Sequence, residues 1–376
     1  MIAKPSPRSE IDSDVEGIEE GTSDGWGEYP LDAVFVRTEP RTVEAVVERI
    51  EGKRYVLDPD FQRDFLWSVQ KQSKLIESCV MRIPLPVFYV AEAPDGRIIV
   101  VDGLQRLTTF ARFVSNRFRL TGLSNNEGGG AHILEGKLFK DLPLNLQERV
   151  QDTPLTMYIL DAKAPERARL DIFERVNSGE PLTRQQMRNA LYNGPATKWL
   201  KEAAESDGFR SATGQSLNTK TMRDREAINR FCAFKLLGWK SYKTSDMDGF
   251  LAAGLKKLAG LSDAKRTELR AAFDSAMTLN RRLFGEHAFR KSLAAQTVGV
   301  ARSVINISLF EVCAVIMADP DLRSQGKNVE KRLKSDVVAL MHDDEFLRAI
   351  TYSTNSTNTV AKRFAAMEGV LRELGL

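Results

Sequence analysis

The spacing of apolar residues divides the chain into a mixed first half and a helical second half. Residues 43–50 and 70–81 carry apolar positions three and four apart, which predicts amphipathic helices. Runs of β-branched and aromatic residues predict strands instead. These runs are residues 55–57, 87–90, 98–101 and 156–160. A turn sequence at residues 93–96 separates the second and third runs, so we expect a β-hairpin there.

Two further helices are expected in the first half. One begins directly after Gly103, because Leu104, Leu107 and Ala111 follow helical spacing. The other runs from Pro165, which suits the first helical position, to about Asn177. Together these elements describe a domain that mixes strands with helices.

Beyond residue 195 the strand patterns nearly vanish. Helical spacing is found at residues 196–206, 223–238, 264–284, 294–318, 327–341 and 359–373. The fold class expected is therefore α+β, with a mixed domain followed by an all-α domain. A length of 376 residues favours two domains. The expected boundaries are 1–28 for a disordered acidic tail, 29–195 for the mixed domain and 196–376 for the helical domain.

Charge is spread unevenly along the chain. The net charge is +3, but residues 1–28 hold eight acidic residues against Lys4 and Arg8. The remaining residues therefore carry about +9, a balance compatible with a partner that bears phosphates. The acidic segment has too few apolar residues to order itself, which is why we expect a tail.

Composition excludes several classes of protein. The three cysteines, Cys79, Cys232 and Cys313, lie far apart and predict buried free thiols rather than a disulfide framework or a zinc site. Neither a long apolar run nor a signal pattern is present, so we expect a cytoplasmic protein without a membrane partner. The three histidines are scattered, which disfavours a self-contained HNH nuclease.

The most informative stretch is the transition from the strand at 98–101 to the following helix. Asp102 and Gly103 end the strand, and the first turn of a helix offers free amide N–H groups and a partial positive charge to an anion. Arg106 could hold a phosphate by two bonds, and Thr108 and Thr109 add hydroxyl donors. Asp102 could hold Mg²⁺ or orient a water molecule. Alternatively, Asp102 caps the helix.

Two other polar clusters accompany this stretch. Gln62 and Arg63 lie among the aromatic residues of 58–68, and their alternative role is in a surface loop pinned by a salt bridge. Asn177 lies in 173–183, where the residues also fit a helix end. Basic residues of the second half could contact DNA, but interspersed acids favour solvated helix faces. They are Arg281, Arg282, Arg290, Lys291, Lys327, Lys331, Arg332 and Lys334.

These segments, taken together, resemble a known bacterial family. The stretches 58–67, 74–78, 83–86, 102–109 and 173–190 are similar to the N-terminal domain of GmrSD-type modification-dependent restriction enzymes, which has a ParB/sulfiredoxin-like core. A weaker resemblance continues into the helical half at 222–224 and 306–310, so it covers most of residues 40–370. Many members read Asp-Gly-Gln-Gln-Arg where this chain has Leu104 at the first glutamine. Gln105 and Arg106 keep the rest of the motif.

The resemblance implies a nucleotide site and a role in defence. Its phosphate side would be Asp102, Gly103, Gln105, Arg106, Thr108 and Thr109, with Gln62 and Arg63 on the opposite wall and Asn177 at the rim. Asp102 and Arg106 would be the catalytic pair of an NTPase, with Mg²⁺ at Asp102. The expected function is an NTP-binding and NTP-hydrolysing module of a restriction or anti-phage system that relies on a separate nuclease subunit.

Two alternatives remain open. In one, the ParB-like core grips duplex phosphates, and the chain is a DNA-binding or DNA-sensing subunit. In the other, the fold is a scaffold for a nuclease without NTPase activity, which Leu104 in the motif would favour.

Overall fold

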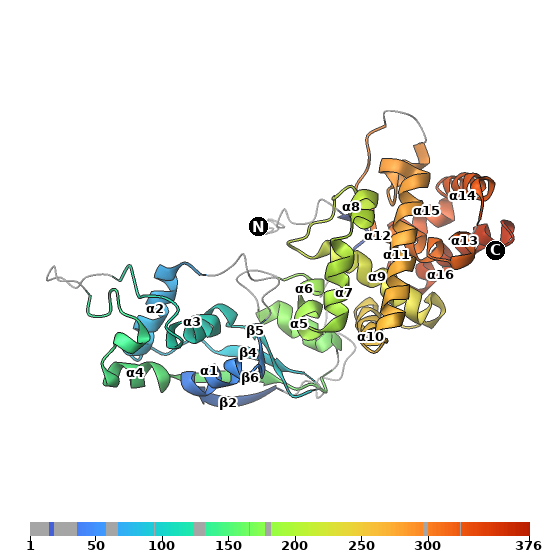
Figure 1. The fold of residues 1–376 in the computed structure, drawn as a ribbon. Helices are drawn as coiled ribbons and strands as arrows, with labels where there is room; N and C mark the ends of the chain where they lie inside the picture. Colours follow the sequence, from blue (N-terminus) through green and yellow to red (C-terminus); the bar gives the residue numbers. More distant parts are fainter. Residues whose placement is uncertain are drawn as a thin grey trace, which may run out of the picture. The chain divides into compact units, whose positions relative to one another are not determined.

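The computed structural model describes most of the chain (Figure 1). The described residues are 15–18, 36–57, 67–93, 95–123, 132–164, 166–176, 182–295, 300–323 and 325–376. They belong to two units, which we call the N-terminal unit (Gly25–Leu182 and Gln186–Leu191) and the helical unit (Met1–Asp24, Thr183–Gln185 and Tyr192–Leu376). Strands with helices in the first unit and a mostly helical second unit confirm the α+β class.

A five-stranded sheet with the order β2-β6-β4-β5-β3 is the framework of the N-terminal unit. β4 and β5 pair antiparallel, which confirms the predicted hairpin. β6 pairs antiparallel with β2 and parallel with β4, and β3 pairs parallel with β5. The strand bounds are Val36–Thr42 (β2), Tyr55–Val56 (β3), Phe88–Glu92 (β4), Ile98–Asp102 (β5) and Pro154–Leu160 (β6).

Strand β2 has no counterpart in the sequence prediction. Its residues are mostly polar and charged, and they lack the alternation that marks a half-buried strand. β2 lies at the edge of the sheet, where Pro40 is tolerated because a strand at that position has one unpaired side. Pairing with the apolar strand β6 therefore determines its conformation.

Helices contact the sheet on both faces. Alternate residues of the strands, among them Phe88, Val100 and Met157, join one core with residues of four helices. These helices are α1 (Val43–Glu51), α2 (Val69–Val80), α3 (Leu104–Val114) and α4 (Leu144–Gln151), with a 3-10 turn at Phe139–Asp141. The intervening residues Ile99 and Val101 are also buried, and α5 (Glu166–Val176) contacts β5.

The helical unit packs around two central helices, α9 and α12, whose residues are buried on nearly every side. α6 (Arg184–Leu191) crosses the division between the two units. The other helices are α7 (Pro195–Ala204), α8 (Asp207–Thr213), α9 (Arg223–Leu237), α10 (Met247–Ala259), α11 (Asp263–Phe284), α12 (Ile307–Met317), α13 (Pro320–Arg323), α14 (Lys327–Leu340), α15 (Asp344–Thr351) and α16 (Thr357–Glu373). 3-10 turns occupy Trp239–Ser241, Gly285–His287 and Lys291–Ala295.

The continuous helix predicted for residues 294–318 is wrong. The chain instead forms a short strand, β7 (Ile305–Asn306), and α12 begins only at Ile307. Asn306 fixes this start, because its side-chain oxygen accepts a hydrogen bond from the N–H of Leu309 at 2.9 Å. The helical domain is therefore not purely α.

The acidic N-terminal segment also contributes a strand. β1 (Val15–Glu16) pairs parallel with β7, with Val15 opposite Ile305 and Glu16 opposite Asn306. The expectation of a disordered tail does not hold for residues 15–18, while the rest of 1–28 lies outside the described residues. Sequence composition is a property of the whole segment and does not reveal a docked part a few residues long.

A buried ion cluster joins the central helices to α16. Glu311 on α12 accepts hydrogen bonds from Arg363 Nε at 2.8 Å and from Arg230 Nη1 at 3.1 Å. All three side chains are at most 2% exposed. Arg230 also donates to the side chain of Asn355, and Arg363 donates to the carbonyl of Thr354 at 2.7 Å. The cluster therefore holds the turn between α15 and α16 in place.

Asp224 in the first turn of α9 makes stability depend on pH. Burial raises the pKa of this carboxyl from 3.8 to about 6. Between pH 3.8 and about pH 6, Asp224 binds a proton more strongly in the folded state than in the unfolded chain. Its contribution to stability therefore falls as pH rises through this range. We expect Asp224→Asn to raise the free energy of unfolding at pH 7 by up to about 3 kcal/mol, and to have little effect at pH 4. Urea denaturation at both pH values measures this, and a gain that is equal at both would contradict it.

Candidate functional site

The junction between β5 and α3 depends on a glycine. β5 ends at Asp102, and Gly103 precedes α3 with φ +97°, a left-handed conformation that side chains disfavour. A Cβ at this position would lie 2.3 Å from Cδ1 of Phe88 on β4. Gly103 is therefore required both by its backbone angle and by the close approach of β4. It allows the strand to turn into the helix within one residue.

Arg106 lies in the first turn of α3, but its guanidinium turns inward. It donates to the carbonyls of Pro86 and Val87 and, at 2.9 Å, to Oδ2 of Asp102. The guanidinium also lies 4.1 Å from the ring centre of Phe88. The residue is only 8% exposed, and burial lowers its pKa while Asp102 opposes that change. Arg106 therefore connects the start of α3 to the segment before β4.

Asp102 is the exposed member of this ion pair. Its side chain is 40% exposed, against 10% for that of Arg106. Oδ2 accepts from Arg106, and no hydrogen bond from the described residues reaches Oδ1. The alternative role as a helix cap does not apply, because Gly103 is the cap residue of α3 and no side chain caps it. The arrangement orients one carboxylate at the exposed end of the sheet.

The remaining motif residues on α3 have different surroundings. Gln105 accepts a hydrogen bond from the N–H of Trp67 at 3.1 Å through its side-chain oxygen. Thr109 is buried, and its hydroxyl donates to the carbonyl of Gln105 at 2.7 Å, one turn earlier in the helix. Thr108 is half-buried. Asp102, Gln105 and Thr108 are thus half-buried at the junction, whereas Gly103 is buried and the hydroxyl of Thr109 serves the helix itself.

Three predicted residues cannot be placed. Gln62 and Arg63, the proposed opposite wall, and Asn177, the proposed rim, lie outside the described residues. Their part in the site stays a prediction.

Trp67 and its neighbours on α2 are residues that the sequence analysis did not assign to the site. Gln72 donates to the carbonyl of Trp67 at 2.5 Å and accepts from Arg112 of α3 at 3.2 Å. The ammonium group of Lys71 lies 4.3 Å from the ring centre of Trp67. These contacts connect α2 to α3 beside the motif. No motif in the sequence indicated Lys71 or Gln72.

Leu104, where many relatives have glutamine, points into the protein. It is 8% exposed and belongs to the hydrophobic core of the N-terminal unit. Its side chain therefore does not occupy the exposed part of the junction.

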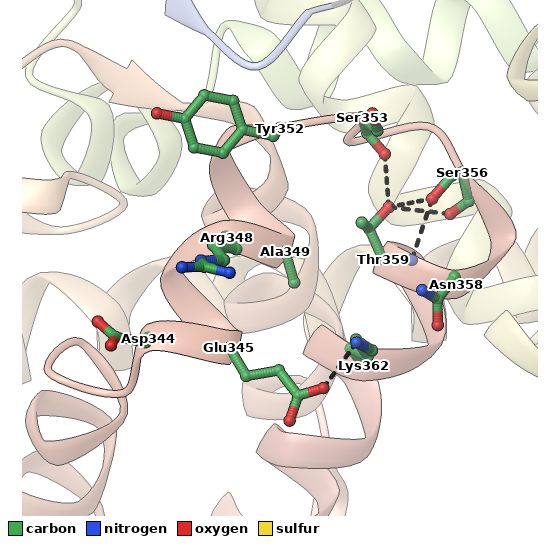
Figure 2. A pocket seen from close by; sticks show the side chains of 10 residues that line it. All are labelled: Asp344, Glu345, Arg348, Ala349, Tyr352, Ser353, Ser356, Asn358, Thr359 and Lys362. Carbon is green, nitrogen blue, oxygen red and sulfur yellow. Dashed lines mark hydrogen bonds and ion pairs between the residues drawn. The ribbon is translucent and has the colours of Figure 1, made fainter.

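A hollow that was not expected from the sequence lies in the helical unit between α15 and α16 (Figure 2). It has a volume of about 790 Å³ and includes Tyr352, which is 69% exposed. Asp344 and Glu345 line it together with Arg348 and Lys362, and Lys362 pairs with Glu345 at 2.7 Å. The charges of its wall are balanced, so it lacks the one-sided charge that favours a phosphate.

Four of the eight basic residues considered for DNA contact have partners within the helical unit. Arg282 pairs with Glu330, Lys291 pairs with Glu16, and Arg332 lies 3.8 Å from Asp336. Arg290 is buried and donates to main-chain carbonyls. These pairings favour solvated helix faces over a DNA-binding stripe.

No metal site can be assigned from protein ligands alone. In the described part of the chain, no three histidine, cysteine, aspartate or glutamate side chains lie close enough together to hold an ion. At the β5–α3 junction, Asp102 would be a single carboxylate ligand for an ion. Mg²⁺ commonly binds through one or two carboxylates with substrate phosphates and water, so this donor set fits the ion only in company with a nucleotide.

Comparison with known proteins gives one finding. Residues 43–193 match the model of the family described as GmrSD restriction endonuclease, N-terminal domain. The match confirms the resemblance noted from the motifs over these residues, and the resemblance in the helical half stays a prediction. No curated protein and no solved structure matches the chain. The ParB-like character of the core therefore stays a prediction.

Within the described residues, no helix is both long enough and apolar enough to cross a membrane.

Proposed function

We propose that the chain is an NTP-binding module of a modification-dependent restriction or anti-phage defence system, with its nucleotide site at the β5–α3 junction. The family of residues 43–193 supports a restriction context. The geometry of the junction supports a site for a phosphate with Mg²⁺. The family match rests on the sequence, whereas the description of the junction rests on the contacts of its residues.

The observation that carries the proposal is the state of Asp102. Its carboxylate is held by Arg106 through one oxygen and is 40% exposed, at the exposed end of a buried strand. The free amide groups that begin α3 lie directly after it along the chain. An anion at these amides and a cation at Oδ1 of Asp102 would complement each other.

This arrangement changes the role assigned to Arg106. The guanidinium of Arg106, which we expected to hold a phosphate, donates instead to the carbonyls of Pro86 and Val87. We therefore assign Arg106 the role of positioning Asp102. Asp102 would hold Mg²⁺ and could orient an attacking water, so slow NTP hydrolysis is part of the proposal. Gln105 and Thr108 would contact the nucleotide from the same helix.

DNA cleavage is assigned to a separate nuclease subunit. The chain has three histidines, His132, His287 and His342, without the spacing of an HNH site. His132 pairs with Glu77, and His287 lies 2.9 Å from the hydroxyl of Ser292. Asp343, next to His342, caps α15 by accepting from the N–H of Phe346. These contacts support structural roles for the histidines and their neighbours.

The test is a thermal-shift screen of ATP, GTP, CTP and UTP with Mg²⁺ on the wild type and on Asp102→Asn. A ligand at a hundredfold over its dissociation constant stabilises the fold by about 2.7 kcal/mol. We expect one nucleotide to raise the unfolding temperature of the wild type, and Asp102→Asn to weaken its binding at least tenfold. Asp95→Asn, in an exposed turn where Asp95 pairs with Arg97, is the matched control.

Two results would contradict the proposal. One is the absence of a shift with any of the four nucleotides. The other is an equal shift in the wild type, Asp102→Asn and Asp95→Asn, which would place the nucleotide elsewhere. In the first case, retention of duplex DNA at low salt that falls steeply with added salt would favour the DNA-binding alternative.

A further inference from the structure

The N-terminal segment docks on the helical unit through more than its two paired residues. Glu16 forms an ion pair with Lys291, and the hydroxyl of Thr354 donates to the carbonyl of Gly17 at 2.8 Å. Val15 and Ile18, on either side, pack against the hydrophobic core of the unit. Four consecutive residues therefore each have a distinct contact.

Gly17 is favoured by its backbone conformation. Its φ is +84°, while a Cβ there would lie 3.4 Å from Cγ2 of Ile307 and 3.6 Å from Cγ2 of Thr354, which are ordinary van der Waals distances. A side chain is therefore disfavoured by the backbone angle, and a branched one would also press on these two neighbours. The surface thus selects an apolar residue, a carboxylate, a glycine and a second apolar residue in that order.

The receiving surface is held in place by contacts that do not involve the segment. Asn306 of β7 is fully buried, caps α12 and donates to the carbonyl of Ile350 at 2.8 Å. Thr354 is also fully buried, and its carbonyl accepts from Arg363 of the ion cluster. A surface fixed in advance binds an extended peptide with less loss of entropy.

We propose that β7, Lys291 and Thr354 form a strand-accepting peptide groove, and that residues 15–18 are its tethered and exchangeable ligand. Addition of a strand to an exposed strand edge supplies main-chain affinity, and the neighbouring side chains supply specificity. The tether makes docking of the segment an intramolecular event, which favours it over a free peptide. A free copy of the segment therefore competes poorly until the tethered one is weakened.

The experiment uses the full chain with Glu16→Lys and Gly17→Val, which weaken the tethered segment. A fluorescent peptide of residues 12–21 is titrated into this variant and into the wild type, and its anisotropy is measured. We expect the peptide to bind the double variant at least tenfold more tightly than the wild type. The same peptide carrying Gly17→Val should not bind either protein.

A charge reversal tests the contact with Lys291. Added to the double variant, Lys291→Glu should reduce binding of the natural peptide at least tenfold and favour a peptide with Glu16→Lys. Lys198→Glu, on an exposed lysine of α7, is the matched control and should leave binding unchanged.

Hydrogen exchange on the wild-type chain provides a measurement that needs no variant. The proposal requires slowed exchange of the amides of residues 15–18 compared with the free peptide. Exchange at the free-peptide rate would overturn it. So would a double variant that keeps the wild-type unfolding temperature yet fails to bind the peptide, or peptide binding that Lys291→Glu does not change.

Discussion

Replacing Arg106 by alanine is expected to lower the free energy of unfolding by about 3 kcal/mol. The buried guanidinium satisfies the carbonyls of Pro86 and Val87 and neutralises part of the charge on Asp102. Alanine leaves both carbonyls without their donor and removes the group that packs on Phe88. Both hydrogen bonds are only partly buried, so each lost bond costs about 1 kcal/mol, and the lost packing on Phe88 supplies the rest of the effect.

Arg97→Ala is the control for this prediction. Arg97 pairs with Asp95 in a turn where both side chains are about half exposed, so its removal should cost less than about 1 kcal/mol. Urea denaturation of both variants measures the difference. A similar cost for the two arginines would contradict the structural role of Arg106. Arg106→Lys should recover only part of the loss, because an ammonium group lacks the planar fork that reaches several acceptors.

This result bears on how the nucleotide site should be tested. A variant of Arg106 that loses nucleotide binding would be ambiguous, since the loss could follow from a loosened junction. Asp102→Asn keeps an acceptor for Arg106 and changes only the charge that faces solvent. It therefore separates ligand binding from folding more cleanly.

The sequence predicted the position of the candidate site but not the direction of its arginine. The hairpin of β4 and β5 and the start of α3 follow from local patterns, and all three are present. The partners of Arg106 are carbonyls 19 and 20 residues earlier in the chain. No periodicity within the motif carries that information, so a first-turn arginine was assigned to a phosphate.

The helical unit contains elements that are too short to be predicted from a sequence pattern. Helical spacing located most of its helices, but β1 and β7 have only two residues each and cannot show an alternation. Asn306 interrupts an otherwise apolar run, and its role as a cap became clear only from its contact with Leu309. Glu311, a lone acid within the apolar helix α12, pairs with arginines far away in sequence.

Glu311→Ala is expected to lower the free energy of unfolding by about 3–5 kcal/mol, the largest effect predicted for a single substitution in this chain. The change leaves Arg230 and Arg363 buried without their carboxylate. Burial lowers the pKa of Arg363 and Glu311 opposes that change, so the acid keeps the guanidinium charged in the core. Urea denaturation gives the measurement.

Glu345→Ala is the matched control for Glu311→Ala, because Glu345 pairs with Lys362 at the surface and is 67% exposed. Its removal should cost less than about 1 kcal/mol. Equal costs for the two glutamates would contradict the structural importance of the buried cluster. Glu311→Gln keeps the shape of the side chain but not its charge. Its loss in the free energy of unfolding should lie between those of Glu311→Ala and Glu345→Ala.

The same substitution connects the ion cluster to the peptide groove. Arg363 holds the carbonyl of Thr354, and the hydroxyl of Thr354 holds Gly17. In a Glu311→Gln chain that remains folded, Arg363 loses its charged partner and Thr354 is less firmly fixed. Exchange of the amides of residues 15–18 should then accelerate more than exchange in the sheet of the N-terminal unit. Equal acceleration in both units would mean that the cluster affects only global stability and does not position the groove.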